Sequence, residues 1–175
     1  VYSRYSRTMH RTTPVTYPLD GTAAGRLFLR QRDEYSCGPA CLASAAALYQ
    51  ITASNYDNFR TALSPNPVTG SDNFDMATQA EKHLPFVSSG EDIYQGGIAI
   101  ANIIQDEGHY VLFLCREDGR VIYYDPYHHV LIEDDITAIE WISESGHLKK
   151  WCINLAKIEN NSLQRWRDMA TPQKA

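Results

Sequence analysis

Residues 35–56 form the longest stretch of the chain without a charged side chain. Small and apolar residues fill positions 37–50, which predicts a helix with Ser36 as its N-cap and with Gly38 and Pro39 in its first turn. The stretch is too weakly apolar to span a membrane, because it contains Gly38, Pro39, Ser44, Gln50, Thr52 and several Ala. A helix without a charged face is typical of the buried centre of a domain.

Helical patterns come first along the rest of the chain, and strand patterns follow. Further helices are predicted over 53–63 and over 72–83, the second with Ser71 as its N-cap. Strands are predicted over 97–104, 109–115, 121–125 and 150–158, with a hairpin turn at 116–120 and a helical segment at 134–144. This order predicts the α+β class, with one long N-terminal helix packed on an antiparallel sheet.

Composition adds limits to this picture. The 175 residues fit one domain, which we expect over 26–158, with a flexible N-terminal arm at 1–25 and a polar, helical C-terminal tail at 159–175. The net charge of −5 argues against a nucleic-acid partner, and no internal repeat is visible. The chain lacks an initiator Met, which indicates a trimmed or processed product, and no signal peptide is recognisable.

Four cysteines, at positions 37, 41, 115 and 152, form no CxxC pair. Cys115 and Cys152 lie in apolar runs and are interpreted as small buried side chains, which weakly favours a reducing compartment. Cys37 is different because it stands at the predicted start of the longest helix, where the positive end of the helix dipole favours a thiolate. Two alternatives stay open for Cys37, namely a buried structural thiol and, with Cys41 and His109, a zinc ligand.

A nucleophilic cysteine needs a base, and His109 is the candidate because it begins a predicted strand. A three-residue hairpin loop would pair Arg116 with Arg120 and set His109 opposite Tyr127. Asp125 would then be the diagonal neighbour of His109 on one sheet face and could orient the imidazole. A two-residue loop would put Asp125 on the wrong face, so the hypothesis requires an odd-length loop or a bulge. Asp125, which precedes Pro126, could equally be a simple turn residue.

The oxyanion formed during attack needs preorganised hydrogen-bond donors. The backbone N–H of Cys37 at the helix start is one candidate. Gln31 lies six residues earlier, and its side-chain amide can be a second donor if the intervening chain loops back. By composition alone, Gln31 would be interpreted as a surface residue.

Three segments together resemble the bacteriocin-leader-processing cysteine peptidases and their stand-alone relatives. They are QRDEYSCGPACLASAAALY at 31–49, GHYVLFL at 108–114 and RVIYYDP at 120–126, with a looser match at 70–80. The resemblance spans about 27 to 158 and implies a papain-like fold, with Cys37 as nucleophile, His109 as base, Asp125 as orienting residue and Gln31 as oxyanion donor. Many members of that family are fused to an exporter, whereas this chain has neither a membrane segment nor a Gly-x-x-x-x-Gly-Lys loop.

The function predicted from these residues is a bacterial cysteine peptidase that hydrolyses peptide bonds through a thioester. One alternative is a glutamine deamidase or amidase of the effector or toxin type, which would use the same residues. A second alternative is a binding module without catalysis. We expect a protein or peptide substrate, no cofactor, no metal, no nucleic acid and no membrane span, in the cytoplasm or in a target cell after secretion. The substrate and the oligomeric state are not predicted.

Overall fold

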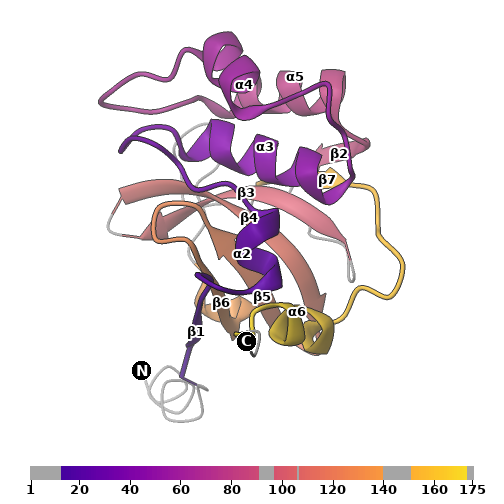
Figure 1. Ribbon diagram of the computed structural model, residues 1–175. Coiled ribbons are helices and arrows are strands. Elements are labelled where there is room, and N and C mark those ends of the chain that lie inside the picture. Colours follow the sequence, from indigo (N-terminus) through magenta and orange to yellow (C-terminus); the bar gives the residue numbers. More distant parts are fainter. Residues whose placement is uncertain (1–12, 91–96, 106, 140–150, 173–175) are drawn as a thin grey trace.

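The computed structural model describes residues 13–90, 97–105, 107–139 and 151–172 (Figure 1). Its α-helices are α2 (Ala23–Leu27), α3 (Cys37–Leu48), α4 (Tyr56–Leu63), α5 (Asn73–His83) and α6 (Leu163–Met169). Its strands are β1 (Val15–Pro18), β2 (Phe86–Gly90), β3 (Ile98–Gln105), β4 (Glu107–Glu117), β5 (Arg120–Asp125), β6 (Val130–Asp135) and β7 (Cys152–Leu155), with a short 3-10 turn, η1 (Ile136–Ala138).

The seven strands form one sheet in the order β1-β6-β5-β4-β3-β7-β2, and neighbouring strands run antiparallel throughout. Helices precede most of the sheet in the chain and pack on one of its faces (Figure 1). The predicted α+β class, with a long helix on an antiparallel sheet, is therefore confirmed. Among the described residues, no helix is both long and apolar enough to cross a bilayer.

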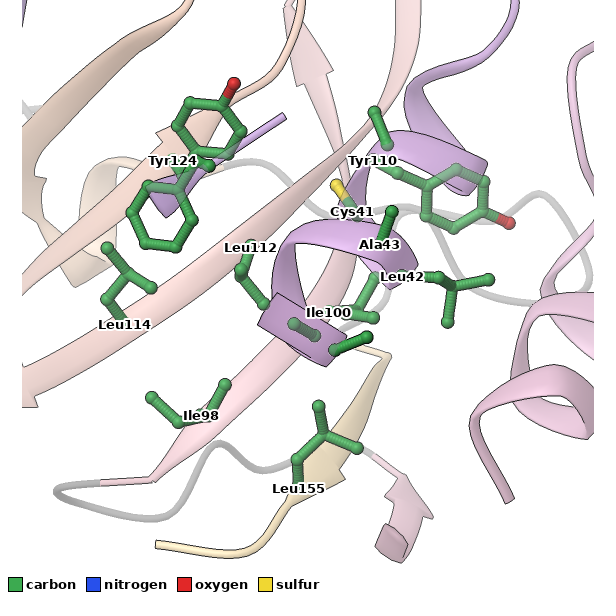
Figure 2. Close-up of a cluster of buried hydrophobic side chains, with 14 of the residues drawn as sticks. Cys41, Leu42, Ala43, Ile98, Ile100, Tyr110, Leu112, Leu114, Tyr124 and Leu155 are labelled. Carbon is green, nitrogen blue, oxygen red and sulfur yellow. The ribbon is translucent and has the colours of Figure 1, made fainter. Parts of the chain in front are cut away.

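Helix α3 is the centre of the core, as the absence of a polar face predicted. Its first ten residues are all buried, and it lies between the sheet and the pair α4 and α5 (Figure 1). Figure 2 shows side chains of β3, β4 and β7 gathered against this helix; among them are Ile98, Ile100, Leu112 and Leu155. Burying a side chain of this size stabilises the fold by about 1.5–3 kcal/mol, so this packing fixes the position of the helix start firmly.

The β4–β5 hairpin has a different loop length from the one predicted, although His109 and Asp125 still meet. Glu117 pairs with Arg120, so the loop has only two residues, Asp118 and Gly119, both with positive φ (51° and 77°). The predicted three-residue loop, with Arg116 opposite Arg120, is therefore wrong. A register shift between Phe113 and Cys115 compensates for this difference.

This bulge puts His109 and Asp125 on the same face of the sheet, as the sequence hypothesis required. Cys115 pairs with Ile122, whereas Leu112 beyond the bulge pairs with Tyr124. One extra residue in β4 changes which side chains face the helices. Continuing the register beyond Leu112 sets His109 opposite Tyr127 and keeps His109 on the same face as Asp125.

Two other element predictions need correction. The helix predicted from 72 has Asp72 as its N-cap, not Ser71, and the Asp72 side chain accepts from the Asp75 N–H. The helix predicted over 134–144 is wrong at its start, because β6 extends to Asp135 and only η1 follows. β-Branched residues and pairing with β5 favour the strand there. Residues 140–144 lie outside the described residues.

Regular structure also occurs near both ends of the described chain. Strand β1 lies within the segment predicted as an arm and pairs with β6, and α2 begins in that segment and extends to Leu27. Helix α6 lies within the segment predicted as a tail, and its Trp166 is fully buried and stacks on Phe28. The division into arm, domain and tail stays a prediction, and residues 1–12 lie outside the described residues.

Candidate active site

Cys37 is the first residue of α3 and is 9% exposed. Gly38 and Pro39 follow it, and Pro39 has no N–H, so the first-turn donors without an intrahelical partner are the N–H groups of Cys37 and Gly38. These donors and the helix dipole favour negative charge at this position. Ser36 precedes the helix as predicted, but its side chain makes no capping bond and donates to Asp33 instead.

The sulfur of Cys37 has a polar contact that sequence reasoning missed. The backbone N–H of Tyr110 donates to Cys37 Sγ at 3.4 Å. A backbone donor carries no sequence signal, so only the fold can reveal it. Because Tyr110 follows His109 directly, this bond also draws the start of β4 towards the start of α3. Cys37 is 9% exposed, whereas Cys41 one turn later is fully buried.

His109 and Asp125 form a direct pair. Nε2 of His109 lies 2.7 Å from Oδ1 of Asp125, and the Asp125 side chain is 1% exposed. A carboxylate accepts hydrogen bonds, so Nε2 carries the proton and Nδ1 is left for a second interaction. The Cys37 side chain also interacts with the His109 ring, and this interaction raises the pKa of His109. Cysteine, histidine and aspartate thus converge from α3, β4 and β5.

For both His109 and Asp125, burial and the interactions with neighbouring groups shift the pKa in opposite directions, and these interactions together have the larger effect. Burial alone would lower the pKa of His109, but the hydrogen bond to Asp125 and the interaction with Cys37 outweigh it and raise the pKa to about 9. Burial alone would raise the pKa of Asp125, but His109, then His128 and the Tyr127 N–H, lower it to about 2. At neutral pH the arrangement therefore favours a carboxylate beside an imidazolium.

Gln31 is also brought to this region. Its backbone N–H donates to the Pro126 carbonyl at 3.1 Å, which ties it to the residue after Asp125. It is 8% exposed, so its interpretation by composition as a surface residue is wrong. Its Nε2 donates to the Asp33 carbonyl at 2.7 Å, and its buried Oε1 has no partner among the described residues. An amide nitrogen has two N–H groups, so one remains for another acceptor.

The loop between Gln31 and Cys37 is held by Asp33. Its carboxylate accepts from Ser36 Oγ, from the Tyr35 N–H at 3.2 Å and from Arg60 of α4 at 2.9 Å. Burial would raise the pKa of Asp33, but the hydrogen bonds from Ser36 and Arg60 lower it below its ordinary value. Asp33 thus contacts both ends of the loop, since its carbonyl also holds the Gln31 amide.

Gly38 lies in close contact with Met76 of α5 and with Ser71 in the loop before α5. A Cβ at this position would meet Met76 Sδ at 2.8 Å and Ser71 Oγ at 3.1 Å. We expect Gly38→Ala to lower the free energy of unfolding by about 1 kcal/mol, because overpacking costs about 1–3 kcal/mol and Ala returns about 0.5–1 in a helix. Urea unfolding measures this. Gly90→Ala, with nothing near its Cβ, is the matched control, and equal stability of the two variants would contradict the prediction.

The zinc alternative gains no support from these contacts. Within the described ranges, no cluster of three or more His, Cys, Asp or Glu side chains could hold a metal ion. Burial raises the pKa of Cys41 well above its ordinary value, and negative charge at Cys37 and Asp125 adds to this effect. A neutral, buried thiol is a poor metal ligand.

Comparison with known proteins finds similarity among solved structures. No family model matches the chain, and no curated protein is detectably similar to it. Among solved structures, it matches the peptidase domain of Streptococcus ComA, a bi-functional ABC transporter involved in a quorum sensing pathway. The match has 21% identity and a TM-score of 0.47 and covers 75% of this chain and 98% of that domain.

A likeness of this degree does not extend to chemistry, so function is inferred below from the contacts of the chain's own residues.

Proposed function

We propose that this protein is a cysteine peptidase that hydrolyses amide bonds through a thioester on Cys37. The observation that supports this most is the convergence of three groups from separate elements. Cys37 Sγ accepts the Tyr110 N–H at 3.4 Å, and the adjacent His109 lies 2.7 Å from the buried Asp125. Convergence of sulfur, imidazole and carboxylate is the arrangement that nucleophilic catalysis by cysteine needs.

In the proposed reaction, the Cys37 thiolate attacks the carbonyl carbon of the scissile amide. The oxyanion that forms accepts hydrogen bonds from the Cys37 N–H and from the free N–H of Gln31 Nε2. Each such donor is typically worth about 3–4 kcal/mol in the transition state. The His109 imidazolium gives its Nδ1 proton to the leaving amine, the C–N bond breaks, and an acyl thioester remains.

Hydrolysis of the thioester completes the cycle. Neutral His109 takes a proton from water through Nδ1, and the hydroxide formed attacks the acyl carbon. The C–S bond breaks, the carboxylic acid leaves, and the Cys37 thiolate and His109 imidazolium are restored. Throughout, Asp125 holds Nε2 protonated and faces the positive charge on the ring, so that the same histidine can serve as acid and as base.

Treatment of a bacterial or host-cell lysate with the protein, followed by mass spectrometry of peptides and intact targets, tests this proposal. We expect new protein termini that are absent when Cys37→Ala replaces the wild type. Targets that gain about one dalton per site without new termini would instead establish the deamidase alternative. No difference between wild type and Cys37→Ala across lysates would support the binding-module alternative and overturn the proposal.

A further inference from the structure

A second imidazole contacts the carboxylate of Asp125. Nδ1 of His128 lies 2.8 Å from Oδ2, whereas His109 occupies Oδ1. The two histidines differ in their surroundings, because the His109 side chain is 11% exposed and the His128 side chain is 61% exposed. His128 therefore lies at the solvent side of a carboxylate that is itself 1% exposed.

The turn after β5 fixes where His128 lies. The backbone N–H of Tyr127 donates to Asp125 Oδ1 at 2.9 Å, and the N–H of His129 donates to the Asp125 carbonyl at 2.9 Å. These two bonds wrap residues 125–129 around the carboxylate. The rings of Tyr127 and His128 pack edge to face, with their centroids 4.8 Å apart. The two backbone hydrogen bonds and the ring contact with Tyr127 therefore hold the His128 imidazole against Oδ2.

A donor on each oxygen controls the plane of the carboxylate. The terminal torsion of an aspartate side chain is broad, so one strong bond leaves the group free to rotate about its axis. Oδ1 accepts from His109 and from the Tyr127 N–H, and Oδ2 accepts from His128. Without His128, the carboxylate can rotate and water gains access to Oδ2. Water would screen the charge that favours the His109 imidazolium.

The other titratable groups around Asp125 do not replace this donor. The buried side chains of Cys41 and Tyr124 face the carboxylate, and burial raises the pKa of each. The Tyr124 hydroxyl is engaged with Nδ1 of His129 at 2.7 Å. Arg30 interacts with Tyr124 and His129 and has no hydrogen bond to Asp125 among those that the described residues make.

We propose that His128 is a positioning residue that holds Asp125 in the orientation that sustains the His109 imidazolium and, through it, the reactive Cys37 thiolate. This inference rests on the proposed function, since it assigns a role within the same site. It goes beyond the triad because the hydrogen bond of the His128 ring is to Asp125, through which it would act.

The rate of iodoacetamide labelling at Cys37, measured from pH 4 to pH 10 with peptide mapping, tests the role of His128. We expect His128→Ala to react about tenfold more slowly at pH 6, with the rise of its rate profile displaced by about one pH unit to higher pH. A fully buried hydrogen bond to a charged group would produce a change larger than tenfold. The exposure of His128 to solvent reduces the expected change. His128→Asn keeps an N–H donor near the place of Nδ1 and is expected to restore most of the wild-type profile.

His83→Ala is the matched control, because His83 is an exposed histidine at the end of α5 that contacts Phe59. Its profile should equal that of the wild type. Identical profiles for wild type and His128→Ala would overturn the inference, as would a slow His128→Ala that His128→Asn fails to restore. A wild-type Cys37 no faster than free cysteine would instead defeat the proposed function, so the two failures are distinguishable.

Discussion

The His109→Ala variant is expected to alkylate at Cys37 about 30-fold more slowly than the wild type at pH 7. An ordinary thiol with a pKa near 8.5 is only about 3% thiolate at that pH, whereas a thiol paired with an imidazolium is mostly thiolate. His109 supplies that partner, because Asp125 and Cys37 raise its pKa to about 9. The rate constant with iodoacetamide, resolved by peptide mapping, measures the effect.

Peptide mapping is needed because four cysteines are present. The other three are 0–1% exposed, so their labelling reports unfolding and serves as an internal control. His83→Ala again provides the exposed-histidine control and should match the wild type. Equal rates for wild type and His109→Ala, with the other cysteines unlabelled, would show that this imidazole does not activate the sulfur.

Replacing Asp125 by alanine is expected to lower the free energy of unfolding by about 3–5 kcal/mol near pH 5–6. The substitution removes the acceptor for His109, for His128 and for the Tyr127 N–H, and it leaves a buried imidazole without its partner. Urea unfolding at several pH values measures this loss. Asp57→Ala is the matched control, because Asp57 is 75% exposed in its pair with Arg32, and it should change stability by less than about 1 kcal/mol.

The pH dependence of this loss follows from the two pKa shifts. The pKa of Asp125 falls from 3.8 to about 2 on folding, so its contribution is present above about pH 4 and is lost as the pH falls through 2. The pKa of His109 rises from 6.5 to about 9, so its contribution is present below about pH 6.5 and is lost as the pH rises through 9. The stability difference should therefore be largest between pH 4 and 6.5. A difference that stays constant from pH 3 to pH 9 would contradict an ionised pair.

Local patterns were sufficient to predict the elements that carry the site. The uncharged stretch predicted α3 and its start at Cys37, and alternation with a Gly turn predicted β4 and β5. The contact between His109 and Asp125 was also predicted, but from a hairpin loop of the wrong length. In the structure, a bulge at Leu114 puts these two residues on the same face of the sheet. Bulges depend on packing across the sheet, so a sequence pattern indicates only that one is needed.

Features that depend on distant contacts were not predicted. Helix α6 lies in the tail that was predicted to be polar and helical, but the burial of its Trp166 depends on packing against Phe28 and on a bond to Asn161. The burial of Gln31 likewise depends on Asp33 and on the turn at Pro126. His128 did have a local signal, since Asp125 begins a Pro-containing turn and an Asp side chain often bonds within such a turn. Its contact with Oδ2 could be assigned only after the orientation of Asp125 was known.

The rate of Cys37 alkylation in the wild type as a function of pH tests the central claim most directly. A thiolate held by the His109 imidazolium predicts rapid labelling already at pH 5–6, well below the range in which free thiols react. A labelling rate that rises once, with a midpoint near pH 8.5, and reaches only the rate of free cysteine would contradict the claim. Cys37, His109 and Asp125 would then not form a working nucleophilic site.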